Sequence, residues 1–286
     1  MNVILGASGQ VGSNIVKELA ARGLPTRAVV RKKKTDFDSR VEVKEADFFD
    51  LPQLTKALEG GSTVFLLTPE DPSSTDILGD TKQVINNYHQ AIQANGIKKL
   101  VGLSCVGAHV EGNTGNILMS RMLELGFDDL NLSKVFIRPS YYFSNWLGFM
   151  ETIEQYGVMP SFFPADLKID MNSPLDVAKF AAKAIVDDHK ESDKQIFELA
   201  GPEKYSSREV AEVFARVLHK KVEVQSIPKE QWKQTLLSAG FTDNTSANLM
   251  AMTQAVIDQS VPPEHEDQVN KLSTSLEQYL TEMFKG

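Results

Sequence analysis

Short apolar runs alternate with amphipathic stretches of helical period along residues 1–140. Each run has the length of a buried strand, and each following stretch repeats apolar residues three and four positions apart, as a helix with one buried face does. This alternation predicts an α/β fold, with helices on both faces of a doubly wound parallel sheet. The expected strands are Asn2–Leu5, Thr26–Val30, Val41–Ala46, Thr63–Leu67, Lys99–Ser104 and Lys134–Pro139, and the expected helices are one that ends before Gly23, then Leu51–Leu58, Asp80–Asn95 and Ile117–Leu125.

The junction between the first strand and the first helix is rich in glycine. Gly6, Gly9 and Gly12 follow one another at intervals of three residues. Gly6 allows a tight turn, Gly9 leaves the backbone open to a pyrophosphate, and Gly12 lets the helix pack close to the sheet. The helix N-terminus adds unpaired N–H groups and a partial positive charge. We interpret the turn as a Rossmann-type nucleotide site; the alternative is a tight turn that binds nothing.

A change of pattern after Tyr156 predicts a second, smaller lobe. Prolines interrupt the chain between positions 160 and 174, and a helix and a strand then follow before position 200. We expect residues 1–155 to form the Rossmann-type domain, with residues 166–200 returning to its sheet. Residues 156–286 are expected to form a smaller, mostly helical lobe over the sheet edge, where substrates are usually recognised.

Basic residues follow the second expected strand. Arg31 is succeeded by three lysines, and no acid lies between Gly23 and Lys34. An acid at the end of this strand would accept from the ribose 2′-hydroxyl of NAD, whereas a guanidinium binds a 2′-phosphate with charge-assisted hydrogen bonds. The pattern therefore favours NADP over NAD. The alternative is a basic loop that is merely solvated.

Composition narrows the class of protein. The net charge of −8 disfavours a general nucleic-acid surface, and the single cysteine, Cys105, fits a reducing compartment. No apolar run approaches the length that spans a membrane, and a strand follows Met1 too closely to leave room for a cleavable signal. The five histidines show no metal-ligand spacing. We expect a cytoplasmic monomer or homodimer that binds no metal, membrane or nucleic acid.

Further motifs accompany the glycine turn along most of the chain: Arg27–Arg31, Ala46–Asp47, Leu66–Pro69, Ile137–Pro139, Leu175–Ala178 and Phe197–Pro202. With the turn, they resemble the NmrA-like family of atypical short-chain dehydrogenases/reductases. The resemblance implies NADP binding, in a family of quinone reductases, azo- and triphenylmethane-dye reductases and NADP-sensing regulators. It places Gly6, Ala7, Ser8, Gly9, Gln10 and Val11 at the pyrophosphate, Arg31 at the 2′-phosphate, Asp47 and Phe48 by adenine, Leu67 and Thr68 along the ribose, and Ser104 and Pro139 near the nicotinamide.

The catalytic pair typical of short-chain dehydrogenases is absent. In those enzymes a lysine four residues after a tyrosine lowers the tyrosine pKa, and the tyrosine passes a proton to the substrate oxygen. None of the six tyrosines here has a lysine at that spacing, and Ile117 to Arg121 hold the place of the pair. Ser104 and Tyr141 are candidates to orient a substrate oxygen. Tyr141 belongs to an aromatic cluster that forms either a pocket wall or core.

Two functions fit these observations. Hydride transfer to an electrophilic acceptor asks little of a protein beyond positioning. We therefore expect an NADPH-dependent oxidoreductase that passes hydride to a quinone, an azo compound or a similar conjugated acceptor. The alternative is a non-catalytic NADP-binding regulator that reports redox state to a protein partner. The missing pair is compatible with both.

Overall fold

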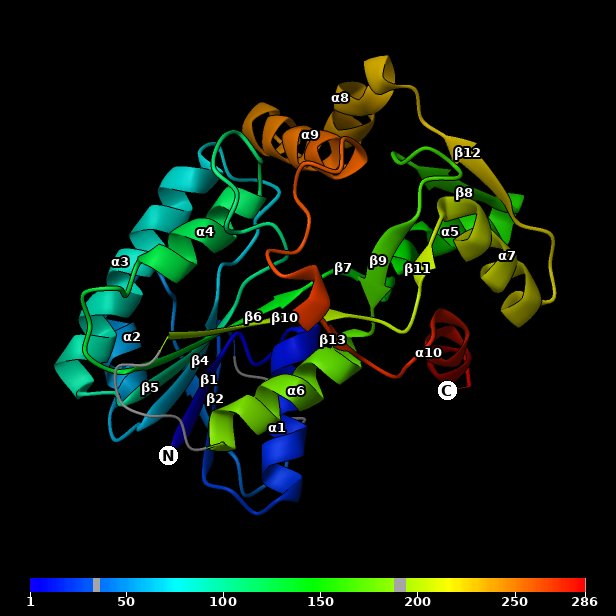
Figure 1. Ribbon diagram of the computed structural model, residues 1–286. Coiled ribbons are helices and arrows are strands. Elements are labelled where there is room, and N and C mark those ends of the chain that lie inside the picture. Colours follow the sequence, from blue (N-terminus) through cyan, green and yellow to red (C-terminus); the bar gives the residue numbers. More distant parts are fainter. Residues whose placement is uncertain (33–36, 188–193, 286) are drawn as a thin grey trace.

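A parallel sheet of eight strands lies at the centre of the computed structural model, which describes residues 1–32, 37–187 and 194–285 (Figure 1). Its order, β3-β2-β1-β4-β5-β6-β10-β13, contains the 3-2-1-4-5-6 arrangement of dinucleotide-binding folds. The predicted α/β class with a doubly wound parallel sheet is confirmed. The strands are β1 (Asn2–Leu5), β2 (Thr26–Val30), β3 (Glu42–Glu45), β4 (Thr63–Leu67), β5 (Lys99–Leu103), β6 (Ser133–Pro139), β10 (Lys194–Ala200) and β13 (Asn270–Lys271).

Helices cover both faces of this sheet, because the central strands carry apolar side chains on both faces. In β1, Val3 and Leu5 belong to one core cluster, and Ile4 between them belongs to the other. Two helices pack on the Ile4 face and three on the opposite face (Figure 1). The first two are α1 (Gln10–Ala21) and α6 (Pro174–Val186), and the other three are α2 (Leu51–Leu58), α3 (Ile77–Asn95) and α4 (Ile117–Leu125).

The ends of these helices follow local sequence signals. Asp50 caps α2, since its carboxylate accepts from the backbone N–H of Gln53 at 3.0 Å. Gly96 closes α3 with a φ of +60°, as expected of a left-handed C-cap. The same helix begins at Ile77 rather than at Asp80, because Asp76 supplies an earlier cap to the N–H of Gly79 at 3.1 Å.

The smaller lobe has its own core, to which Phe143, Trp146 and Phe214 contribute. It contains more strand than its sequence pattern indicates: β7, β9 and β11 form one sheet, and β8 pairs in parallel with the distant β12. β12 overlaps residues 221–224, whose alternating apolar and polar side chains predict a short strand. The other strands are too short to show a period, so pairing between remote segments creates them. The strands of this lobe are β7 (Tyr141–Tyr142), β8 (Val158–Ser161), β9 (Ile169–Asn172), β11 (Lys204–Tyr205) and β12 (Glu223–Ser226). Its helices are α5 (Met150–Tyr156), α7 (Ser207–Leu218), α8 (Lys229–Ser238), α9 (Asp243–Ile257) and α10 (Leu276–Met283), and its 3₁₀ turns are η1 (Phe143–Phe149) and η2 (Glu266–Gln268).

Segments from the C-terminal half return to the large sheet. α6 packs beside α1, and β10 pairs with β6 in parallel. β13 then pairs with β10, which nothing in the sequence pattern indicates. The boundary between residues 155 and 156 stays a prediction. No helix within the described ranges is both long and apolar enough to cross a membrane.

Helix α9 connects the C-terminal part of the chain to loops at the carboxyl edge of the sheet (Figure 1). Near its start, Thr245 Oγ1 donates to the carbonyl of Pro72 at 2.8 Å, and Asn244 Oδ1 accepts from the N–H of Ile77 at 2.9 Å. Farther along, a Cβ added to Gly115 would collide with the carbonyl oxygen of Asn248. The helix therefore lies directly on the loops that follow β4 and precede α4.

Candidate active site at the carboxyl edge of the sheet

The carboxyl ends of five adjacent strands bring the predicted site residues into one row. β1 lies between β2 and β4, where the chain changes its direction of travel across the sheet, and open α/β sheets bind ligands at such a point. A parallel sheet places all these strand ends at one edge. In the spatial order β2, β1, β4, β5 and β6, the ends carry Arg31, the glycine turn, Leu67 with Thr68, Ser104, and Pro139.

The glycine turn has the geometry of a phosphate cradle. Gly6 has a φ of +66°, and its carbonyl accepts from the N–H of Gly9 at 2.9 Å. A Cβ on Gly12 would collide with that same carbonyl, so α1 packs against the turn as closely as expected. Ser8, Gly9 and Gln10 are exposed, and the first turn of α1 has neither a capping side chain nor an acidic residue. An exposed helix start without a cap fits the pyrophosphate of a dinucleotide, because the first N–H groups of a helix have no partner within the helix.

The edge beside the turn is basic. Arg31 is exposed at the end of β2, and its charge reaches the loop after β4, where it helps the hydrogen bonds from Ser73 to lower the pKa of Asp71. Lys32 is also exposed. Lys33 and Lys34 lie outside the described residues. The position of Arg31 is compatible with the predicted 2′-phosphate contact, which stays a prediction.

The two residues expected by adenine differ in exposure. Asp47 is exposed and accepts from the N–H of Phe49 at 3.0 Å. The Phe48 ring is buried and packs edge-to-face on Tyr88, with ring centroids 5.6 Å apart. Any contact of Phe48 with a nucleotide would therefore involve its backbone.

Ser104 is part of a buried ionic cluster that the sequence reasoning missed. Its hydroxyl donates to Glu124 Oε1 at 2.5 Å, and Arg138 donates to both carboxylate oxygens of Glu124 at 2.8 Å. Arg138 also pairs with Glu264 at 2.6 Å and with Glu198 at 3.5 Å. Because the Ser104 proton is given to Glu124, this hydroxyl can only accept from a substrate. The charged residues Arg138 and Glu198 inside two otherwise apolar strands were the sequence signal that could have revealed this cluster.

The two adjacent tyrosines of β7 face in opposite directions, as neighbours in a strand do. Tyr141 packs in the smaller lobe against Phe163 and Trp146, with centroids 5.5 and 5.8 Å away. Tyr142 packs against the core of the large sheet, and its hydroxyl is buried with no hydrogen-bond partner among the described residues. Tyr141, the residue selected from the sequence, therefore lies against the lobe core, and Tyr142 faces the sheet.

A carboxylate that sequence reasoning also missed lies beyond Leu67 and Thr68, the residues predicted to lie along the ribose. Glu70 follows Thr68 and Pro69 after β4, and its Oε2 accepts from Asn116 Nδ2 at 3.1 Å. Desolvation of its carboxyl by neighbouring atoms raises the pKa of Glu70, although the residue as a whole is exposed to solvent. Burial also raises the pKa of Cys105 to about 12, so this thiol carries its proton at neutral pH. A redox-active thiolate at Cys105 is thus disfavoured.

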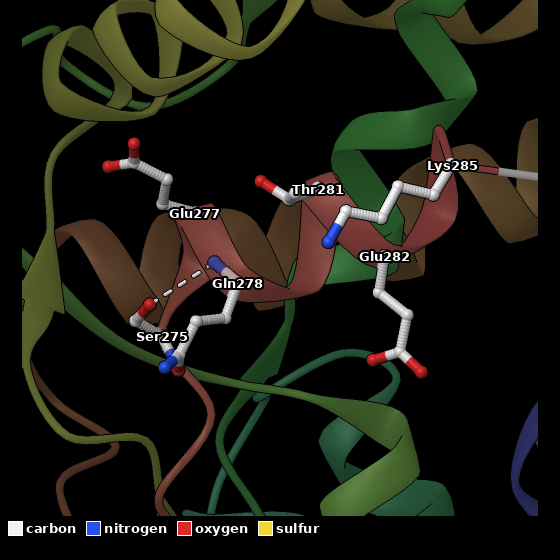
Figure 2. Close-up of a pocket in the computed structure, with 6 residues that line it drawn as sticks. All are labelled: Ser275, Glu277, Gln278, Thr281, Glu282 and Lys285. Atoms are coloured by element: carbon white, nitrogen blue, oxygen red, sulfur yellow. Dashed lines mark hydrogen bonds between the residues drawn. The ribbon is translucent and has the colours of Figure 1, made fainter.

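A surface pocket of about 670 Å³ beside α10 does not belong to this edge (Figure 2). Its side chains all come from α10 and the residues at its two ends: Ser275, Glu277, Gln278, Thr281, Glu282 and Lys285. One helix face with no group from a second element offers no catalytic arrangement. Among the described residues, no three histidine, cysteine, aspartate or glutamate side chains gather where they could hold a metal ion.

Comparison with known proteins places this site in context. The chain is 27% identical over 242 residues to the (4-alkanoyl-5-oxo-2,5-dihydrofuran-3-yl)methyl phosphate reductase of Streptomyces griseus, covering 83% of this chain and 81% of the relative. It is 25% identical over 251 residues to the NAD(P)H azoreductase of Xenophilus azovorans, covering 85% and 83%. The crystal structure of the NADPH-dependent quinone oxidoreductase of Escherichia coli complexed with NADPH superimposes with a TM-score of 0.74, at 22% identity, covering 99% of this chain and 100% of that one.

The match to a family model covers nearly the whole sequence, from residue 2 to residue 284. It confirms the resemblance drawn from the glycine turn and the later motifs. The relatives are reductases, which supports a nicotinamide-dependent oxidoreductase in general terms. The chain belongs to the NmrA-like family.

Proposed function

We propose that this protein is an NADPH-dependent reductase that passes hydride to a conjugated organic acceptor. The observation that carries the proposal is the exposed, uncapped start of α1 at the glycine turn, next to Arg31 at the switch point of the sheet. Backbone N–H groups and a guanidinium are the partners that a pyrophosphate and a 2′-phosphate require.

The residues along the sheet edge fit NADPH in the order of its parts. The glycine turn would hold the pyrophosphate, Arg31 the 2′-phosphate and Asp47 the adenine end. Leu67 and Thr68 would lie along the ribose, and Ser104 and Pro139 beside the nicotinamide. When bound, NADPH supplies a hydride. The chain itself would orient the acceptor against that end of the edge and exclude water there.

The acceptor is proposed to be a quinone, an azo compound or a similar conjugated molecule. Its electrophilic character removes the need for the Tyr–Lys pair, whose place at the start of α4 is taken by Ile117 and Arg121. The reductase relatives favour turnover, and we do not propose the regulator alternative. We also propose a cytoplasmic location, in keeping with the single cysteine.

The test is oxidation of NADPH, followed by absorbance, against a panel of quinones, azo compounds and triphenylmethane dyes, with NADH in parallel. We expect acceptor-dependent loss of NADPH that is faster than the loss of NADH. Protein that binds NADPH but reduces no acceptor would contradict the proposal and favour the alternative, an NADP-binding regulator without turnover.

A further inference from the structure

We propose that Glu70 is the catalytic acid of this site, which delivers a proton to acceptors whose reduced form is a basic anion. The inference rests on the proposed function and extends it. It assigns the proton donor that the missing Tyr–Lys pair leaves open, and it favours azo compounds and conjugated carbonyl compounds as acceptors.

Glu70 lies in the loop after β4, at the same edge of the sheet as the residues predicted to contact the cofactor. It follows Leu67 and Thr68 after β4, and its hydrogen bond from Asn116 brings it to the loop between β5 and α4. Its charge acts on Cys105 after β5 and on Tyr142 after β6, where it adds to the effect of burial in raising the pKa of both side chains. Glu70 is therefore close to the ends of the two strands assigned to the nicotinamide.

Unpaired polar atoms point to a ligand at the same place. Asn116, which holds Glu70 through its Nδ2, has a buried Oδ1 without a partner in the described part of the chain. The hydroxyls of Tyr142 and of Thr114, two residues before Asn116, are buried and unpaired as well. Buried polar groups in folded proteins are nearly always satisfied by protein, water or ligand. We infer that these unpaired atoms form hydrogen bonds with a polar atom of the bound acceptor, or with water when no acceptor is bound.

The surroundings of Glu70 favour its protonated form. Burial raises its pKa and outweighs the hydrogen bond from Asn116, which acts in the opposite direction. Cys105 and Tyr142, the titratable groups on which the Glu70 charge acts, are neutral at pH 7, since a thiol and a phenol titrate above that pH and burial raises both pKa values further. Asp71 is next on the loop, and the charge of Arg31 helps to lower its pKa. The charges of Glu124 and Arg138 act on Cys105. Since Glu70 is open to solvent, water can restore its proton after each turnover.

The proton step balances simply. Hydride addition to an azo bond forms one N–H bond and leaves the electron pair of the broken N–N π bond on the other nitrogen. Glu70 then gives its carboxyl proton to that nitrogen, which yields the neutral hydrazo product and a Glu70 carboxylate. A cationic triphenylmethane dye needs no such step, because hydride addition to its central carbon already gives a neutral product.

The difference between these acceptors makes the test selective. In Glu70→Gln, we expect kcat/KM for an azo compound to fall about 100-fold, the lower end for loss of a general acid, while reduction of the cationic dye is unchanged. For the wild-type protein, kcat/KM for the azo compound should fall as pH rises through the Glu70 pKa. For Glu70→Gln, this decrease with pH should be absent. Asp71→Asn is the matched control, because Asp71 is an exposed acid next to Glu70. The side-chain oxygen of the new asparagine can still accept the hydrogen bond from the Ser73 N–H, so this variant should reduce both substrates at the wild-type rate.

A second measurement needs no cofactor. Infrared difference spectra of the free protein, recorded against pH, should show one carboxyl group that keeps its proton above the ordinary glutamate pKa of about 4.3. The band should be lost in Glu70→Gln and kept in Asp71→Asn.

The outcomes separate the two proposals. Undiminished azo reduction in Glu70→Gln, an equal loss with both acceptors, or no such carboxyl band would overturn the role of Glu70 and leave the reductase standing. Failure of the wild-type protein to reduce either acceptor would instead remove the proposed function, and the donor role with it.

Discussion

Arg31 stands at the exposed end of β2, at the position where a nucleotide fold distinguishes NADP from NAD. At the scale of single residues, we propose that the charge at this strand end sets the preference for NADP, which the fold leaves open. Glu70 is a second residue of this kind, because its surroundings and not its type make it a candidate acid. Both effects depend on a group's position relative to a ligand, so substitution tests them directly.

Arg31→Ala should weaken NADPH binding about 10- to 100-fold and leave NADH binding nearly unchanged, since a charged hydrogen bond contributes about 1.5–3 kcal/mol and 1.4 kcal/mol is a factor of ten. Fluorescence titration of both cofactors measures this. Arg22→Ala, an exposed arginine after the far end of α1, is the control and should alter neither affinity. Equal weakening of both cofactors would show that Arg31 does not contact the 2′-phosphate.

Substitution of two glycines in the same turn should affect different properties: cofactor binding at Gly9 and stability at Gly12. Gly9 has extended backbone angles, φ −80° and ψ 167°, and an added Cβ would meet only the Gly6 carbonyl oxygen at 3.4 Å. Gly9→Val should therefore fold with a free energy of unfolding within about 0.5 kcal/mol of wild type, yet lose both cofactors. Gly12→Ala should lose about 1–3 kcal/mol, because its Cβ collides with backbone. Retained NADPH binding in Gly9→Val would place the cofactor elsewhere.

At the scale of secondary-structure elements, the buried cluster around Arg138 joins α4, β6, β10 and the segment after α9. β6 and β10 place Arg138 directly opposite Glu198, and Glu198 accepts from the backbone N–H of Glu264 at 3.0 Å. Arg138 and Glu198 are each almost fully buried. The cluster therefore sets the position of Ser104 and of the chain that returns from α9.

Arg138→Leu should cost about 3–5 kcal/mol of unfolding free energy, because it leaves buried carboxylates without their cation. Urea unfolding followed by circular dichroism measures the loss. Arg208→Leu provides the control, since Arg208 and Asp166 form an ion pair whose side chains are 56% and 78% exposed, and such pairs contribute about 0–1 kcal/mol. Similar losses in the two variants would contradict a structural role for the buried cluster.

At the scale of the whole molecule, α9 couples the C-terminal half of the chain to the sheet edge. Its hydrogen bonds to the 72–77 loop and its backbone contact at Gly115 hold it close to Asn116 and the loop of Glu70. The site is therefore completed by residues remote in sequence from the glycine turn. A change that lifts α9 should disturb the acceptor end of the site more than the nucleotide end.

Gly115→Ala tests this coupling. Its φ of +59° and the collision of a Cβ with Asn248 should displace α9, raise amide hydrogen exchange in residues 243–257, and impair acceptor reduction more than NADPH binding. Gly112→Ala is matched for backbone strain in the same loop, with a φ of +111°, but nothing lies within 4 Å of its Cβ. Equal exchange in the two variants would show that the contact at Gly115 does not hold the helix.

The glycine turn, the parallel sheet, the N-cap of α2 and the C-cap of α3 were predictable because their signals are local. A φ above zero favours glycine, a capping carboxylate needs a nearby N–H, and the apolar period of each segment reports which of its faces is buried. For the same reason the sequence by itself determined the α/β class and pointed to a nucleotide site at the start of α1.

Only the tertiary structure decided which polar residues meet. The two tyrosines of β7 look equivalent in sequence, and strand alternation turns Tyr141 toward the smaller lobe and Tyr142 toward the sheet. Glu70 and Asn116 are 46 positions apart, and Arg138 and Glu264 are 126 apart, so no local pattern links them. Their pairing follows from strand order and from the docking of α4 and α9, which long-range packing sets.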